Sequence, residues 1–251
     1  MTKYKMKKYL TIIPFIVSFL IGCCIYDYWE FFNFLDTYPS VRLSDKAIFL
    51  NIAGGRNYLS EVNISVYYVI AFVLFLLYIF PPIKPSSFVR LKSRNSYITG
   101  RIADCSIFAF IFAFLIEAVN VTVAFICFDI NIIFSLNFIP YTLLELLTLC
   151  LFYFRAGLVF LAFEVIISRK VAPFITIAFY AVEYSADLAF MISQIWLPFR
   201  DAHVLLKLLT REIQPTDIFS ILFRALVMAL LLIASSYFLF NKKDVLSNVK
   251  K

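Results

Sequence analysis

Long apolar stretches alternate with short polar segments along the whole chain. A helix needs about 20 apolar residues to cross a hydrocarbon layer about 30 Å thick, because it rises about 1.5 Å per residue. Six stretches have a suitable length, namely residues 10–27, 64–81, 104–127, 142–166, 172–197 and 218–240. The pattern therefore predicts about six transmembrane helices.

The apolar stretches have the character of helices rather than strands. The strands of a membrane β-barrel alternate apolar and polar residues over about ten positions, whereas residues 107–116 are almost uninterruptedly apolar. Pro173 opens the fifth stretch, where a missing N–H costs little, and Pro81 and Pro82 end the second. We predict an all-α integral membrane protein that forms a single transmembrane domain over residues 1–251.

The composition excludes two other classes of protein. The chain is 63% hydrophobic and 16% charged, whereas soluble domains are about 45–50% apolar and about 25% charged. A chain of this size has no core large enough to bury that much apolar side chain in water. The 30 Phe and 15 Tyr residues also exclude a disordered chain.

The basic residues predict the orientation of the spans. With a cytoplasmic N-terminus, fifteen Lys and Arg fall in the inside segments and six in the outside segments. The excess of Lys and Arg in cytoplasmic loops therefore predicts that both termini are cytoplasmic. This placement favours a membrane surface, and not nucleic acid, as the partner of the basic residues. We expect a multi-pass protein of the cell membrane, and the Phe-, Ile- and Lys-rich composition is compatible with a bacterial source.

A second interpretation of the first span remains open. The segment Leu20-Ile21-Gly22-Cys23 follows a Lys-rich start and a short apolar run, as in the cleavage site of a bacterial lipoprotein. Cleavage would leave a lipid on Cys23 and five spans, with the charge asymmetry unchanged. The alternative is an uncleaved first transmembrane helix.

The sequence has no motif for catalysis or for a bound cofactor. The five glycines do not form a phosphate-binding loop, and the single histidine, His203, excludes a zinc site that needs two. We expect His203 in a loop outside the bilayer. The five cysteines lie in or beside spans without metal-ligand spacing. We therefore expect no enzymatic activity, no metal and no cofactor on this chain.

Charged residues inside the spans are the candidate functional residues, because burying a charge in lipid is costly. Those near the middle of the bilayer are Glu117, Arg155, Glu183 and Asp187. Glu183 and Asp187 are four residues apart and share one helix face, and Arg155 is the obvious partner for them. The four residues are predicted to form a polar network that either lines a substrate path or fixes the helix packing.

Two segments outside the bilayer have a recognisable pattern. Between spans two and three, apolar and basic residues interleave in a segment that suits either a solvated loop or a short docking helix, with Phe88, Arg90, Lys92 and Arg94 as candidate contacts for a cytosolic partner. Between spans five and six, residues 200–214 predict an amphipathic helix that lies on the outer leaflet or dips into it. Its apolar face would consist of Val204, Leu205, Leu208 and Leu209.

This arrangement resembles the ABC-2-type permease subunits, the membrane halves of ABC exporters. The resemblance rests on six spans, cytoplasmic termini, the basic segment Phe88-Val89-Arg90-Leu91-Lys92-Ser93-Arg94 and the outer helix before span six. It implies a short cytoplasmic coupling helix within residues 86–96 that contacts a separate ABC ATPase, which would hold ATP and Mg²⁺. It also implies a second permease subunit, identical or not, and export of a hydrophobic or amphipathic peptide-like substrate.

Two further functions remain open from the sequence. The chain is also compatible with a stand-alone membrane protein, such as a bacteriocin immunity protein or an accessory subunit. The third hypothesis is an ion- or proton-coupled carrier that uses Glu183, Asp187 and Arg155.

Overall fold

The computed structural model describes residues 60–80, 94–190 and 198–242, with residues 18–19, 21–22, 25–26, 29 and 49 in addition. Every regular element in these ranges is a helix, and none is a strand. The predicted all-helical fold class is therefore confirmed for the described part of the chain. Most of the predicted first span, residues 10–27, lies outside the described residues, as do residues 81–93.

Within the described residues, three helices are long and apolar enough to cross a membrane, which is compatible with a membrane protein. They are α6 (Arg94–Cys127), α8 (Phe138–Ile166) and α11 (Asp217–Lys242). Helix α6 begins ten residues before the predicted third span and ends with it at Cys127, whereas α8 and α11 match their predicted spans within four residues.

Two shorter helices occupy the second and fifth predicted spans. A π-helix, η1 (Asn63–Tyr67), continues directly into α4 (Tyr68–Ile79), and α9 covers Ala172–Phe190. Residues 191–197, at the end of the fifth predicted span, lie outside the described residues. A six-span topology with cytoplasmic termini stays a prediction.

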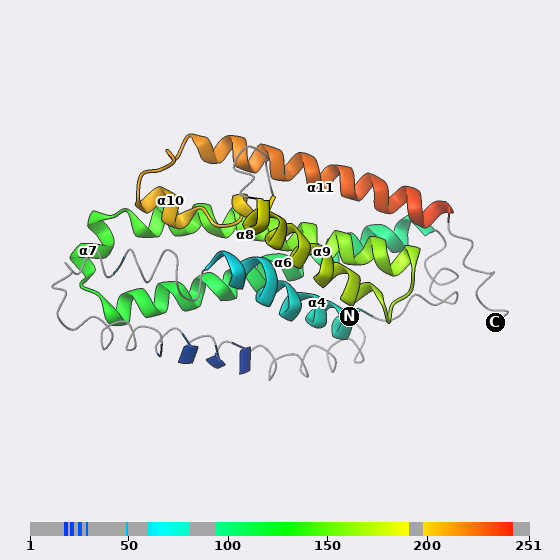
Figure 1. Ribbon diagram of the computed structural model, residues 1–251, viewed down its shortest axis with the longest axis horizontal. Helices are drawn as coiled ribbons and strands as arrows, with labels where there is room; N and C mark the ends of the chain where they lie inside the picture. Colours follow the sequence, from blue (N-terminus) through cyan, green and yellow to red (C-terminus); the bar gives the residue numbers. More distant parts are fainter. Residues whose placement is uncertain are drawn as a thin grey trace.

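Helix α8 lies at the centre of the bundle. It contacts α6, α11, α9, α4, α7 and α10, and Figure 1 shows these helices around it. The connection from α6 to α8 passes through α7 (Ile130–Ser135) at one end of the elongated bundle, which we call the α7 end. At the opposite end, the Lys242 end, α6 begins and α11 finishes.

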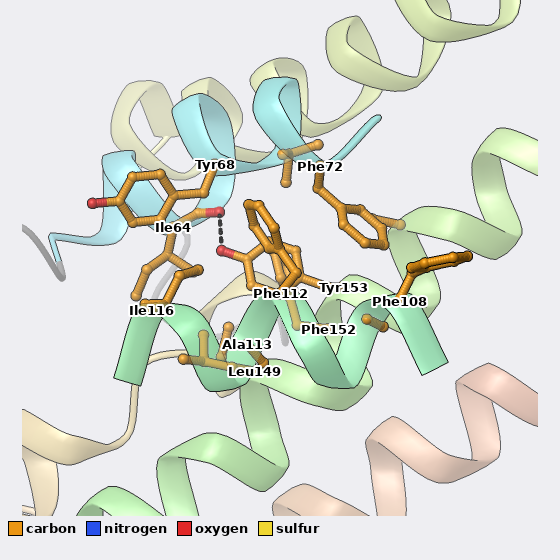
Figure 2. Close-up of a cluster of buried hydrophobic side chains, with 14 of the residues drawn as sticks. Ile64, Tyr68, Phe72, Phe108, Phe112, Ala113, Ile116, Leu149, Phe152 and Tyr153 are labelled. Atoms are coloured by element: carbon orange, nitrogen blue, oxygen red, sulfur yellow. Dashed lines mark hydrogen bonds between the residues drawn. The ribbon is translucent and has the colours of Figure 1, made fainter. Parts of the chain in front are cut away.

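An aromatic cluster joins α4, α6 and α8. The ring centroids of Phe72, Phe112 and Tyr153 lie 4.9–5.5 Å apart in tilted and edge-to-face pairs (Figure 2). Such geometries are the favoured ones for aromatic rings. The hydroxyl of Tyr153 also donates to the carbonyl of Ile64 in η1, at 3.4 Å. The cluster therefore fixes both the packing of these helices and the position of the π-helix.

The segment between α9 and α11 folds back into the bundle. It contains η2 (Pro198–Asp201) and α10 (Leu205–Leu209). The expectation that its apolar face lies on the outer leaflet is wrong, because that face is covered by protein: Val204 and Leu208 pack with Ile218 and Ile221 of α11, and α10 contacts α8. The four predicted face residues, Val204, Leu205, Leu208 and Leu209, are all buried.

Candidate functional site: buried polar clusters along helix α8

Helix α8 makes buried polar contacts at three levels along its axis. The residues of α8 at these levels are Glu145, Arg155 and Glu164, and each is at least nine-tenths buried. With a rise of about 1.5 Å per residue, these levels are about 14–15 Å apart along the helix axis. One helix thus carries a charged side chain near each end and one in the middle of the bundle.

The middle cluster is an ion pair between α8 and α9. Nη2 of Arg155 donates to both carboxylate oxygens of Glu183, at 2.9 and 3.3 Å, and Nε donates to the hydroxyl of Tyr180 at 3.0 Å. The guanidinium carbon also lies 4.9 Å from the ring centre of Tyr180, a cation–π contact. The two charged side chains are only 7% and 8% exposed. The structure thus forms the pair that the sequence suggested for Arg155.

Glu183 also ties α9 to η2, because its Oε1 accepts a hydrogen bond from the backbone N–H of Phe199 at 3.2 Å. The remaining predicted partner, Asp187, belongs to α9, but its side chain lies outside the described residues.

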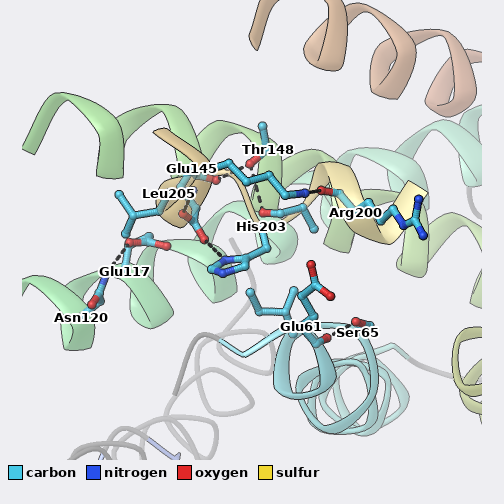
Figure 3. Close-up of polar contacts among 12 residues, drawn as sticks. Glu61, Ser65, Glu117, Asn120, Glu145, Thr148, Arg200, His203 and Leu205 are labelled. Atoms are coloured by element: carbon cyan, nitrogen blue, oxygen red, sulfur yellow. Dashed lines mark hydrogen bonds and ion pairs between the residues drawn. The ribbon is translucent and has the colours of Figure 1, made fainter. Parts of the chain in front are cut away.

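The cluster nearest the α7 end contains the only histidine of the chain. Nδ1 of His203 lies 3.0 Å from Oε1 of Glu145, and Oε2 accepts the backbone N–H of Leu205 at 2.6 Å (Figure 3). Thr148 donates to the carbonyl of Ala202 at 3.2 Å. His203 lies in the connection between η2 and α10, as the predicted loop requires, but its side chain is only 3% exposed. It is buried because residues 202–205 fold back onto α8.

Glu117 belongs to this cluster and not to the Arg155 pair. It is buried on α6, its Oε2 accepts from Nδ2 of Asn120 at 3.4 Å, and it interacts electrostatically with Glu145. The predicted network of Glu117, Arg155, Glu183 and Asp187 is therefore divided: its described members lie in two separate groups. The sequence placed all of them near one depth but held no information on which helix faces meet.

The third cluster lies at the Lys242 end and was not predicted. Glu164 accepts from Nη2 of Arg101 at 3.1 Å and from Nη1 of Arg169 at 3.0 Å. Nη2 of Arg169 donates to the carbonyls of Leu77 and Phe80, and the guanidinium of Arg101 lies 4.5 Å from the ring centre of Phe80. One carboxylate thus links α6, α8, the α8–α9 turn and the end of α4.

The predicted ATPase-contact residues lie almost entirely outside the described residues. Phe88, Arg90 and Lys92 fall within residues 81–93, and Arg94 is the first residue of α6, without a described side chain. The coupling helix itself is therefore untested. Its two flanks are described, because Phe80 precedes the segment and Arg101 follows it, and both belong to the Glu164 cluster.

A groove opens beside the Arg155–Glu183 pair between α8, α9 and α11. It has a volume of about 570 Å³, and its walls are almost entirely apolar. Besides the ion pair, they include Val159 and Phe163 of α8, Ala178 and Val182 of α9, and Met228 and Leu232 of α11.

No group of three or more His, Cys, Asp or Glu residues suited to a metal ion occurs within the described residues. Comparison with protein-family models, with curated proteins and with solved structures finds no match to the chain.

Proposed function

We propose that this chain is the permease subunit of an ATP-driven ABC exporter in a bacterial cell membrane, and that it moves a hydrophobic or amphipathic, peptide-like substrate. The observation that carries the proposal is the η2–α10 segment between α9 and α11, which is held against α8 through Glu145 and Thr148 and against α9 through Glu183. A helical element at this position in the chain is what the resemblance to ABC-2-type permeases implies.

The groove beside α9 supports the substrate class. Its volume of about 570 Å³ falls within the range of about 300–1,000 Å³ that is usual for small-molecule sites. Its walls are apolar, and the charges of Arg155 and Glu183 are already paired with each other. A hydrophobic group is therefore the occupant that such a surface favours.

The Glu164 cluster supports a mechanical role for residues 81–93. The chain enters this segment from Phe80 and leaves it into α6, and contacts to Arg169 and Arg101 tie both flanks to α8. In the proposed transporter, a cytosolic ATPase that binds ATP and Mg²⁺ displaces this segment, and the cluster transmits the displacement to α8. A second permease subunit completes the substrate path.

The proposal is tested by co-purification with an ABC ATPase encoded beside the gene for this chain. Reversing the charges of Arg90, Lys92 and Arg94 to Glu should abolish the complex or reduce permease-dependent ATP hydrolysis at least tenfold. Lys170→Glu, exposed at the Lys242 end, and Arg211→Glu, exposed at the far end, serve as controls and should leave both unchanged. Assembly and hydrolysis that survive the triple reversal would remove the assignment of this segment.

The role of the cluster is tested separately with Glu164→Gln. Without the carboxylate charge, the buried guanidinium of Arg101 loses its anion and the link between the flanking helices weakens. We expect the complex with the ATPase to form and ATP hydrolysis to continue, while substrate export falls at least tenfold. Glu212→Gln, at an exposed position, is the matched control. Equal export by the two variants would show that the cluster does not transmit motion.

A further inference from the structure

We propose that Glu117, Glu145 and His203 form a proton-binding site whose occupancy controls the attachment of the η2–α10 segment to α8. This inference does not depend on the identity of the transported molecule or on an ATPase. It rests on the contacts of the three side chains and on the charge that they place inside the bundle.

Two side chains of α8 attach the η2–α10 segment. Glu145 is fully buried on α8 and binds the η2–α10 segment twice, through the His203 ring and through the N–H of Leu205. Thr148, one turn further along α8, binds the carbonyl of Ala202. Residues 202–205 are therefore held by one carboxylate and one hydroxyl, and the bonds to the carboxylate depend on its charge.

Glu117 faces the same cluster from α6 (Figure 3). Its side chain is 3% exposed, and within the described residues its Oε1 has no hydrogen-bond partner. A buried carboxylate with so few donors is strongly destabilised when it is ionised. A second ionised carboxylate nearby, that of Glu145, adds repulsion.

The charge of the cluster depends on how many protons its three side chains bind. With both carboxylates ionised and the histidine neutral, the three groups carry two negative charges, so two protons make the cluster neutral. A neutral cluster is the stable one in a buried site. We assign one proton to the His203–Glu145 hydrogen bond and the other to Glu117. Loss of the proton from Glu117 leaves the cluster with a net negative charge beside Glu145.

The charged groups around the cluster do not supply the missing positive charge. Asp201 of η2 pairs with Arg224 of α11 at 3.0 Å, and Lys207 of α10 donates to the carbonyl of Arg200 at 3.0 Å. Glu61, on the turn before η1, adds another carboxylate on the His203 side in Figure 3. Arg200 of η2 is half-buried, and in Figure 3 its guanidinium points away from the cluster. The remaining charged groups of the described elements at this end are exposed, namely Asp129 before α7, Arg211 and Glu212 after α10, and Asp217 at the start of α11.

The consequence is a proton-dependent attachment. With the second proton bound, Glu145 faces one cation, His203, and holds residues 202–205. Without it, the ionised Glu117 adds a second negative charge beside the cationic ring of His203, so the segment is held more firmly and separates from α8 less often. The site thus takes a proton as its ligand and responds by releasing the short helices between α9 and α11.

Infrared spectroscopy of the full-length protein in lipid nanodiscs tests the protonation of Glu117. At neutral pH we expect the carbonyl stretch of a protonated carboxylic acid, which disappears in Glu117→Gln and persists in the matched control Glu212→Gln. The absence of this band from the wild type, or its persistence in Glu117→Gln, would overturn the proposal. Equal thermal unfolding of the two variants ensures that the comparison is made on folded protein.

The single histidine allows the coupling to be measured directly. Nitrogen-15 labelling of histidine, in protein prepared without a histidine tag, reports only on His203. We expect its ring to lose a proton at lower pH in Glu117→Gln than in the wild type, because the ionised Glu117 carboxylate favours the cationic ring. An identical titration in both proteins would show that the two residues do not share a site.

Amide hydrogen exchange tests the structural response. After correction for the intrinsic pH dependence of exchange, residues 202–209 of the wild type should exchange more slowly above the pH at which the infrared band disappears, as long as His203 stays cationic. In Glu117→Gln their exchange should not change over the same range. Protection that is independent of pH in the wild type would show that the proton does not control the attachment.

Discussion

At the scale of single residues, Gly157 determines how closely α6 approaches α8. A Cβ atom at this position would overlap with Sγ of Cys105 and lie 3.3 Å from Cδ1 of Leu76. Small residues at helix contacts allow such close packing in membrane proteins, where van der Waals contact is a main source of helix association. The glycine is therefore required by its neighbours, and not by an unusual backbone conformation.

Gly157→Ala should accordingly lower the free energy of unfolding by about 1–3 kcal/mol, the usual cost of overpacking. Gly100→Ala is the matched control, because nothing lies within 4 Å of its added Cβ, and a helix gains about 0.5–1 kcal/mol from this exchange. Thermal unfolding in detergent measures both. Combining Gly157→Ala with Cys105→Ala should recover part of the loss, and strictly additive effects would contradict the assigned contact.

At the scale of elements, two ion pairs connect neighbouring helices, and they differ in their exposure to solvent. Arg155 and Glu183 join α8 to α9 with both side chains buried, whereas Arg224 and Asp201 join α11 to η2 with Arg224 42% exposed. Removing one partner of a buried pair leaves an uncompensated charge. Exposed pairs are screened by solvent and contribute little.

The same exchange of acid for amide should therefore have unequal effects. Glu183→Gln should lower the free energy of unfolding by about 3 kcal/mol or more, and Asp201→Asn by about 1 kcal/mol or less. Denaturant unfolding of both variants in the same detergent provides the comparison. Similar losses would indicate that water reaches Arg155 as readily as it reaches Arg224.

At the scale of the whole molecule, the helices form an elongated bundle around α8, and the two ends of the bundle differ in charge. The Arg101–Glu164–Arg169 cluster lies at the Lys242 end, with two arginines for one glutamate. The turns at the α7 end contain the exposed Asp129 and no Lys or Arg between α6 and α8. This asymmetry agrees with the cytoplasmic side that the Lys and Arg residues predict for the Lys242 end.

Reporter fusions test this orientation. A reporter that works only in the cytoplasm should be active when it is fused after Lys251. A reporter that works only outside the cell should be active when it is inserted between residues 135 and 138, in the turn after α7. The reason is that Lys and Arg are retained on the cytoplasmic side. Activity of the Lys251 fusion on the far side alone would reverse the orientation and exclude contact between residues 86–96 and a cytosolic ATPase.

The helix ends of this fold were largely predictable, since they depend on local sequence. Helices α6 and α8 end at Cys127 and Ile166, as predicted, because Asp129 caps a new helix after the first and the polar residues Ser168-Arg169-Lys170 follow the second. The early start of α6 was not predicted, because residues 94–103 are too polar for a span and continue the helix for another reason: Tyr97 and Ile98 pack against Phe240 and Val165.

The polar contacts were predictable only in part. Arg155 was the only base near the middle of the spans, so elimination suggested its pairing with Glu183. Glu145 and His203 are 58 residues apart, and nothing in the local pattern showed that residues 202–205 fold back onto α8. The one usable signal was a lone histidine followed directly by the apolar residues Val204, Leu205 and Leu206.

The length of α6 gives its packing contact a further meaning. The helix is continuous from Arg94 to Cys127, about 51 Å at 1.5 Å per residue, against about 30 Å of hydrocarbon. Its tight contact with Gly157 lies at Cys105, about 16 Å from Arg94 and about 18 Å from Glu117. A rigid rod that turns about this fulcrum is a lever with nearly equal arms. If α6 turned as a rigid rod about this contact, a sideways push at Arg94 would move Glu117 by a similar distance in the opposite direction.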